Sequence, residues 1–383
     1  MNTNIINSKT VLFLGAGASA YLEKPLMVEF VNELLNDPSI NLNEKNIIET
    51  ITSLRGNDLE EILKEINEIC GRGYFKGATP RNYFKDFFDQ NPKNILGRSL
   101  LGFSALPEPP LPDKSNFGMR YSEICDKCSD LRWKIYEKIF EVYYNVDGLK
   151  VKDLYSPLFN FIQEKMTGKR NIVPVFTTNY DKAIETLSIA DEGIELIDGF
   201  IHIAKKKIDK WSHKSFNDFK PKKNKLNLCL FKLHGSIFWY RVEGEIIYSH
   251  VVTSFPTDRK TETVILFPDD TKEILADPYI TSYSYLQKCF DKAEFIIFVG
   301  YSFRDYITIT FLKSALRFNE KLKVIIIDPN SAKIYKRYFD YYKKRFLCVD
   351  AKFTNEVECY TKPILAFLEE KGVISDASRL SQK

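Results

Sequence analysis

The chain has 383 residues, of which 44% are hydrophobic and 28% charged, so it is a globular protein with enough apolar residues to bury a sizeable core. Its formal net charge of +4 is too small to indicate a dedicated nucleic-acid-binding protein. The sequence predicts neither a membrane helix nor a secretory signal. Seven scattered cysteines, an odd number, favour reduced thiols over a disulfide framework. We therefore expect a cytoplasmic protein without membrane contact.

Six short apolar runs predict the strands of a buried sheet. In chain order they are Val11–Leu14, Ile172–Phe176, Leu228–Leu233, Phe295–Val299, Val324–Ile327 and, with a weaker pattern, Phe346–Val349. Five of the runs are followed at once by Gly, Ser, Asn, His or Asp. Parallel sheets that are covered on both faces contain such runs, and they bind ligands beyond the carboxyl ends of their strands. The sequence therefore predicts an α/β fold with a Rossmann-like, mostly parallel sheet.

Three segments depart from this pattern, and we interpret them as insertions in one domain that spans residues 1–383. Helical spacing of apolar residues in Asp58–Cys70 and Cys125–Tyr144 predicts a helical insertion over residues 50–155. The Lys- and Asn-rich segment 203–227 is typical of a loop. A Gly-Glu turn between alternating residues predicts a β-hairpin within residues 240–262.

The first strand leads into the turn Gly15-Ala16-Gly17-Ala18-Ser19 and then into an amphipathic stretch. A dinucleotide site needs this order of strand, glycine turn and helix, because glycine lets the backbone N–H groups approach a pyrophosphate. The third glycine of the usual fingerprint is missing, so an ordinary tight turn remains the alternative. Gly15, Ala16, Gly17 and Ser19 are our candidate nucleotide-binding residues.

Polar residues also follow the second and third strands. Asn179 can orient a water or a ribose hydroxyl, since its amide both donates and accepts, and Asp181 can accept from a carboxamide. An Asx turn that starts a helix is the alternative for both. His234 stands before Gly235, which gives close access, and histidine is the side chain best suited to moving protons near neutral pH. A buried structural histidine is the alternative.

The fourth and fifth strands supply three further candidates. The turn Gly300-Tyr301-Ser302 has small residues that can admit a ribose or phosphate, with Ser302 as donor. Asp328 follows its strand at the place where an acid commonly binds adenosine ribose hydroxyls. A glycine-containing turn and a helix N-cap are the respective alternatives.

Taken together and in this order, the motifs resemble those of the prokaryotic sirtuin-like (SIR2-like) family. Gly15–Ser19 resembles the family's GAGxS signature, and Thr178–Asp181 resembles its QN-[ILV]-D segment. His234-Gly235 resembles the catalytic HG pair, and Gly300–Ser302 resembles the GTS segment. The resemblance implies that Asn179 positions the attacking group, that Asp181 contacts the carboxamide and that His234 acts as base or orients the ribose. The other candidates, including Asp328, would hold the rest of NAD+.

The chain differs from the deacylases of that family in two places. Their GIPDFR-like segment is replaced by Glu23–Met27, which lacks the Asp-Phe-Arg part. Their two cysteine pairs for a structural zinc are reduced to Cys125-x-x-Cys128, which precedes His234 and lies in a helical pattern. We therefore expect no zinc or other metal and no cofactor besides NAD+ as substrate.

The segment Pro25–Met27 instead resembles the sirtuin-like proteins of bacterial antiphage systems. That resemblance implies cleavage of NAD+ to nicotinamide and ADP-ribose, a homo-oligomer, and a separate partner such as a HerA-type ATPase or an Argonaute-like protein. A non-catalytic nucleotide-binding sensor or assembly module and a protein deacylase are the alternative functions.

Basic residues at Lys205–Lys207, Lys222-Lys223 and Lys343–Arg345, the last among tyrosines, are compatible with nucleic-acid contact. The sequence favours another interpretation, in which an amphipathic helix after Asp328 packs its aromatic side chains on the sheet.

Overall fold

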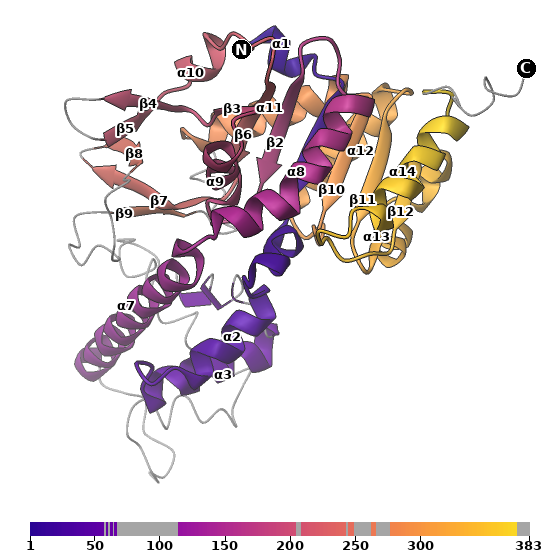
Figure 1. Ribbon diagram of the computed structural model, residues 1–383. Helices are drawn as coiled ribbons and strands as arrows, with labels where there is room; N and C mark the ends of the chain where they lie inside the picture. Colours follow the sequence, from indigo (N-terminus) through magenta and orange to yellow (C-terminus); the bar gives the residue numbers. More distant parts are fainter. Residues whose placement is uncertain are drawn as a thin grey trace, which may run out of the picture. The chain divides into compact units, whose positions relative to one another are not determined.

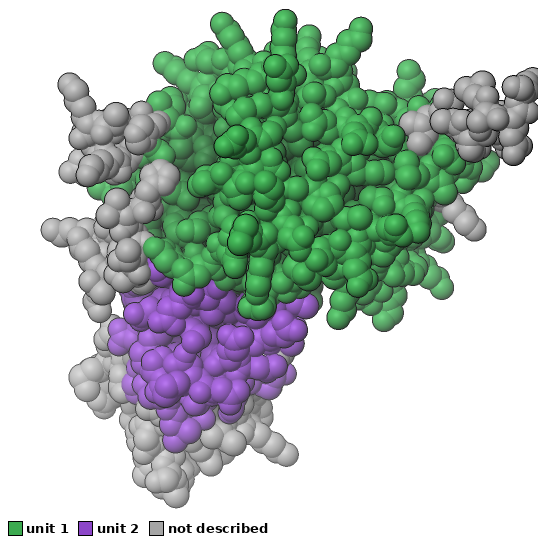
Figure 2. All heavy atoms as spheres, viewed as in Figure 1, with its two compact units in different colours: residues 1–24, 143–383 green, residues 25–142 purple. Residues whose placement is uncertain are grey.

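The computed structural model describes residues 1–56, 59, 62–63, 65–66, 114–203, 208–242, 244–248, 262–265 and 276–373 (Figure 1). The chain divides into two compact units, one of residues 1–24 and 143–383 and the other of residues 25–142 (Figure 2). The second unit thus begins and ends earlier than the helical insertion that the sequence predicts. The organisation as one domain with insertions stays a prediction.

The described part of the second unit consists of helices. They are α2 (Met27–Asn36), α3 (Leu42–Arg55) and α7 (Lys114–Tyr144), of which α7 continues into the first unit. Asn41 caps α3 by accepting the N–H of Glu44 at 3.0 Å, and the Glu44 carboxylate accepts the N–H of Asn41 at 2.8 Å. Lys134 of α7 then donates to Glu44 at 2.8 Å, which joins the two helices. The predicted helix Cys125–Tyr144 is confirmed, whereas most of Asp58–Cys70 lies outside the described residues.

The first unit is built on a seven-stranded parallel sheet with the order β12-β11-β10-β1-β2-β6-β3. The strands are β1 (Thr10–Leu14), β2 (Ile172–Thr177), β3 (Ile194–Ile197), β6 (Leu226–Lys232), β10 (Phe295–Val299), β11 (Lys323–Ile327) and β12 (Phe346–Val349). All six predicted strands are present, and the predicted α/β fold with a Rossmann-like parallel sheet is confirmed. The edge strand β3 was not predicted, because Glu195 interrupts its apolar residues.

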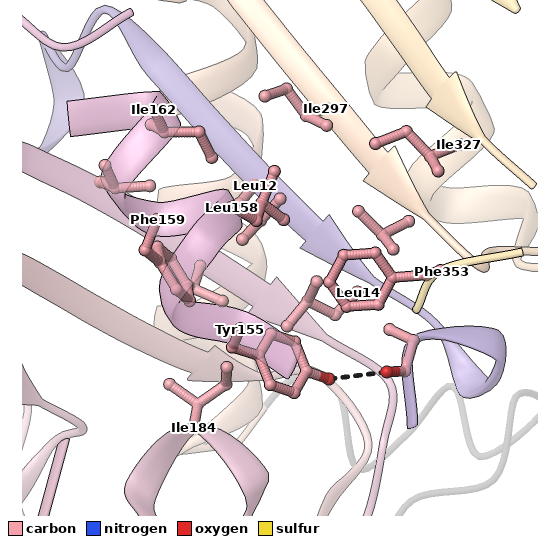
Figure 3. Packing of buried hydrophobic residues seen from close by; sticks show 14 of the residues in the cluster. Leu12, Leu14, Tyr155, Leu158, Phe159, Ile162, Ile184, Ile297, Ile327 and Phe353 are labelled. Atoms are coloured by element: carbon pink, nitrogen blue, oxygen red, sulfur yellow. Dashed lines mark hydrogen bonds between the residues drawn. The ribbon is translucent and has the colours of Figure 1, made fainter. Parts of the chain in front are cut away.

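One face of the sheet packs against α8 (Gly148–Lys165), α9 (Ala183–Ala190) and α14 (Glu358–Glu370). Leu12 and Leu14, two residues apart on β1, both point to this face, where they meet Leu158 and Phe159 of α8 (Figure 3). Because side chains alternate along a strand, the residues between them point to the other face. Burial on both faces explains why these strands are apolar throughout.

The other face is covered through aromatic contacts. Phe176 and Phe231, on adjacent strands, stack with their ring centroids 4.9 Å apart. Phe290 of α11 (Tyr279–Lys292) lies edge-on to Phe176 and to Phe298. Helix α11 also packs against α1 (Thr3–Ile6) and α12 (Tyr306–Phe318), while α13 (Ser331–Tyr338) packs against β12. No helix in the described ranges is long and apolar enough to cross a membrane.

A second, antiparallel sheet has the order β4-β5-β8-β7-β9. Its strands are β4 (Phe200–Ile203), β5 (Ile208–Trp211), β7 (Gly235–Val242), β8 (Glu245–Tyr248) and β9 (Glu262–Ile265). Strands β7 and β8 form the hairpin expected within residues 240–262, around a turn at Gly244. The expectation of a loop over residues 203–227 was wrong, because that segment holds β5 and the short helix α10 (Lys214–Asn217). Pairing of β5 with β4 and β8 overrides its polar composition.

The strand order of the parallel sheet reverses at β1. From β1 the chain proceeds to β2 on one side and later returns to β10 on the other side, so the strand order reverses there. The last residues of β10, β1 and β2, namely Val299, Leu14 and Thr177, are level in register, and Thr177 is level with Lys232 of β6. In such sheets ligands bind outside the carboxyl ends of the strands at the point of reversal. The turns after these strands are therefore the place to examine for a site.

Candidate functional site

The turns that follow β1 and β10 touch backbone to backbone. Gly15 donates its N–H to the Val299 carbonyl at 2.9 Å, and Gly17 donates to the Gly300 carbonyl at 3.0 Å. A Cβ on Gly15 would lie 2.5 Å from the Gly300 oxygen, and one on Gly300 would lie 2.3 Å from the carbonyl carbon of Gly17. Gly300 also has φ +57°, in the left-handed region that favours glycine. Close packing of the two turns thus explains these glycines.

The turn after β1 is a short 3₁₀ helix, η1 (Ala16–Leu22), and its N–H groups are partly used within the chain. Gly17 bonds to Gly300, and Ala18 donates its N–H to the Gly15 carbonyl at 2.9 Å. The buried Tyr155 hydroxyl of α8 donates to the Ala18 carbonyl at 2.9 Å, as Figure 3 shows. The backbone of η1 is therefore fixed from two sides, by β10 and by α8.

Ser19 joins the turn after β1 to the turn after β2. Its hydroxyl donates to Asp181 Oδ2 at 2.8 Å and accepts from Asn179 Nδ2 at 3.1 Å. Asn179 Nδ2 also donates to the Gly15 carbonyl at 3.0 Å. Ser19 and Asp181 are 2% and 4% exposed, so this network is desolvated and correspondingly rigid. Four of the sequence-predicted residues, namely Gly15, Ser19, Asn179 and Asp181, are thus brought together.

Within the described residues, the side-chain amide of Asn179 forms hydrogen bonds through its nitrogen but not through its oxygen. The side chain donates two hydrogen bonds, both from Nδ2, and the backbone N–H donates to the Thr177 hydroxyl at 3.0 Å. Within the described residues no group donates to Asn179 Oδ1. The side chain is only partly buried. Asn179 is therefore held in one orientation with an acceptor oxygen left for a ligand or a water.

Asp181 is more completely bonded within the chain. One carboxylate oxygen accepts from Ser19, and the other accepts the N–H of Ala183 at 2.9 Å, at the start of α9. This second bond is the Asx turn that the sequence offered as the alternative. The carboxylate therefore orients Ser19, and through Ser19 it orients Asn179.

A buried ion pair beneath Asp181 was not predicted. Lys232 Nζ lies 3.0 Å from Glu185 Oε1, donates to the Asp181 carbonyl, and has a side chain only 1% exposed. Burial raises the pKa of Glu185, and the Lys232 ammonium opposes that effect. Lys232 thus fixes the backbone of the turn after β2 from the end of β6. The one signal in the sequence was a lysine inside an otherwise apolar strand.

His234 lies where the chain passes from β6 to β7 and is 3% exposed. Its Nδ1 is buried and has no hydrogen-bond partner within the part of the chain that the structure describes. Burial lowers the pKa of His234, so the imidazole is held neutral, while the charge of Asp305 acts in the opposite direction. Gly235 admits no side chain, since a Cβ there would lie 1.9 Å from the Val264 carbonyl of the neighbouring segment. The pairing of β7 with β9 thus explains the glycine beside the histidine.

Asp305 is a further residue of the site that the sequence reasoning missed. It caps α12 by accepting the N–H of Ile307 at 2.8 Å and the hydroxyl of Thr308 at 2.7 Å. It is also the acid whose charge acts on His234. Its position soon after the fourth predicted strand, past Gly300, was the available signal.

The remaining two candidates have simpler surroundings. Ser302 is exposed, next to Tyr301, whose ring packs on Phe13 with the centroids 4.4 Å apart. Asp328 accepts the N–H of Asn330 at 2.7 Å in a turn just before α13, but the N-cap of that helix is Asn330, so the N-cap alternative for Asp328 was wrong. Partial burial raises the pKa of Asp328. Neither residue is hydrogen-bonded to the network around Ser19.

Replacing Gly300 by alanine tests the contact between the two turns. We expect Gly300→Ala to lower the free energy of unfolding by more than about 3 kcal/mol, because it adds a clash to an unfavourable φ. Gly372→Ala is the matched control, since Gly372 has φ +67° but no atom within 4 Å of the added Cβ. There we expect a loss of about 1 kcal/mol from the backbone alone. Urea denaturation measures both, and equal losses would contradict a packing role for Gly300.

One comparison with known proteins matches part of this chain to a protein family. Residues 173–347 match a family model described as "SIR2-like domain". Similar solved structures include a Sir2 homologue in complex with NAD (TM-score 0.42, 14% identity, covering 97% of this chain and 93% of that one). They also include a mutant Sir2 homologue with 2′-O-acetyl ADP ribose (0.40, 13%, 98% and 100%) and Sir2Tm bound to a propionylated peptide (0.36, 12%, 97% and 97%). The search of curated proteins finds no match. The region from β2 to β12, which holds Asn179, His234 and Gly300, is thus similar to SIR2-like domains.

Proposed function

We propose that this chain is an NAD+ glycohydrolase, which cleaves NAD+ with water to nicotinamide, ADP-ribose and a proton. The observation that carries the proposal is Asn179, which Gly15 and Ser19 fix with its Oδ1 left to accept. It lies in the turn after β2, and β2 pairs with β6, the strand that leads into the buried, neutral His234. The match of residues 173–347 to a SIR2-like domain supports an NAD-related activity.

The chemistry needs little more than these groups. Cationic nicotinamide is a good leaving group, so its bond to ribose C1′ breaks as positive charge develops on the ribose. Asn179 Oδ1 can accept from the attacking water or a ribose hydroxyl and so orient it. His234, neutral because it is buried, can take up the proton that this water or hydroxyl releases. Ser19 and Asp181 hold Asn179 in place, as their hydrogen bonds require.

The biological setting is also a proposal. Unrestrained loss of NAD+ would kill the host cell, so we infer that assembly or a partner switches the activity on. Together with the resemblance of Pro25–Met27 to antiphage proteins, this favours the effector of a defence system that acts by abortive infection. We propose a homo-oligomer that works with a separate protein such as a HerA-type ATPase.

The first prediction concerns the two central residues. We expect Asn179→Ala and His234→Ala each to lower NAD+ cleavage by about 100-fold or more, because each removes a group that acts on the ribose or its nucleophile. Release of nicotinamide and ADP-ribose, separated by chromatography, measures the activity with and without the ATPase. The controls are Asn224→Ala and His213→Ala, at exposed positions, which should keep full activity. If the wild type binds NAD+ but does not cleave it, either with or without the ATPase, the chain is instead a sensor or assembly module.

The second prediction concerns pH. Because burial holds the pKa of His234 below its ordinary 6.5, the acidic limb of kcat/KM should lie below pH 6.5, where the imidazole becomes protonated. Asp305→Asn removes the charge that raises this pKa but keeps an oxygen to cap α12, so the limb should move to still lower pH. A limb at or above pH 6.5 that Asp305→Asn does not move would contradict a role for His234 as base.

A further inference from the structure

A groove of about 1070 Å³ lies near the amino ends of β11 and β12, whereas the candidate site lies at the carboxyl ends of the strands. It is formed by the C-terminal half of α12, the end of α13 and the 3₁₀ helix η3 (Asp340–Arg345), and β12 begins immediately after η3. Helix α12 starts at the carboxyl end of the sheet, after β10, and runs back to the amino end, where β11 begins. The groove is therefore separate from the residues around Ser19 and His234, within the same unit.

The groove carries an excess of positive charge. Lys313, Arg317 and Lys344 line it, and none of them forms an ion pair within the described residues. Glu320 is the one carboxylate among the lining residues. Arg345 is committed to the fold, since its Nη1 donates to the Asn319 carbonyl at 2.9 Å and its Nη2 to the Leu316 carbonyl, at the C-terminal end of α12. Three cations are thus available to an anionic ligand.

Tyrosine rings lie beside these cations, one of them exposed and one partly buried. Tyr341 is 93% exposed, and its ring lies edge-on to Tyr342 with the centroids 5.4 Å apart. The Arg345 guanidinium lies 5.1 Å from the centre of the Tyr342 ring and steadies it. By contrast, Phe339 is 1% exposed and packs on Phe346. The sequence-based expectation that the aromatics of this segment pack on the sheet holds for Phe339 but not for Tyr341.

We propose that this groove binds single-stranded nucleic acid, with bases stacked on Tyr341 and Tyr342 and phosphates held by Lys313, Arg317 and Lys344. Aromatic rings that solvent can reach, next to cations, are the combination that single-strand-binding surfaces use, because a base offers a flat face and its phosphate a charge. A strand fits better than a free nucleotide, since the volume of about 1070 Å³ is slightly larger than the ~300–1,000 Å³ typical of small-molecule pockets. A duplex would present only its phosphates to these rings.

The test measures fluorescence anisotropy of a labelled oligothymidylate with the full chain, without NAD+, at two salt concentrations. We expect Tyr341→Ala to weaken binding about tenfold, the size of one lost stacking contact. Arg317→Glu should weaken binding and make it less dependent on salt, because it removes a phosphate contact. The matched controls are Tyr306→Ala, an exposed tyrosine at the other end of α12, and Lys352→Glu, an exposed lysine outside the groove, and both should bind as the wild type does.

Competition distinguishes a strand from other anions that carry the same chemistry. AMP and inorganic phosphate, at an equal concentration of phosphate groups, should displace the labelled strand poorly. Displacement by AMP as effective as that by unlabelled strand would identify a free-nucleotide site and overturn the proposal. Failure of the wild type to bind the strand, or equal binding by Tyr341→Ala and Arg317→Glu, would also overturn it. Asn179→Ala should bind the strand normally, so this result is independent of the proposed NAD+ cleavage.

Discussion

The buried hydroxyl of Ser19 is the point on which the candidate site depends. It donates to Asp181 and accepts from Asn179, so it ties the turn after β1 to the turn after β2. Three further contacts hold the backbone of these two turns in place. Gly300 contacts Gly15 and Gly17 with no side chain between them. The Tyr155 hydroxyl donates to the Ala18 carbonyl, and the Lys232 ammonium donates to the Asp181 carbonyl. An amide that must orient a water or a hydroxyl needs such support, because a displacement of about 1 Å can cost a catalyst most of its rate.

The sequence was a good guide to the sheet because its strands are buried on both faces and therefore apolar along their whole length. It failed for β3 and β5, because charged residues interrupt their short apolar patterns and pairing with other strands stabilises them instead. For the site, it predicted residues at the ends of strands, and four of these are joined by hydrogen bonds. It missed Lys232, Glu185 and Asp305, because a sequence shows that a charged residue occurs in an apolar stretch but not which distant residue neutralises it.

Several of the sequence signals have a physical explanation in the fold. The glycines at 15, 17 and 300 are explained by the contact between two turns, and Gly235 by the pairing of β7 with β9. Asp181 and Asp328 both accept backbone N–H groups near a helix start. Packing does not explain Asn179, whose Oδ1 accepts from no described residue, or His234, whose buried Nδ1 has no partner among the described residues. A buried nitrogen without a partner is costly to the fold, and an amide fixed with its oxygen left to accept is suited to orienting a ligand, so we propose that these two residues carry the chemistry.

Hydrogen–deuterium exchange of the full chain with and without ADP-ribose is the most direct test that the nucleotide binds at the carboxyl ends of the strands, in the turns after β1, β2 and β10. ADP-ribose contains the pyrophosphate and both riboses of NAD+, and as the expected product it is not consumed. The account predicts slower exchange in residues 15–22, 177–183 and 300–305. It predicts unchanged exchange in η3, which lies at the amino end of β12. Slower exchange in η3 alone, or no change in any of these segments at saturating ADP-ribose, would contradict it.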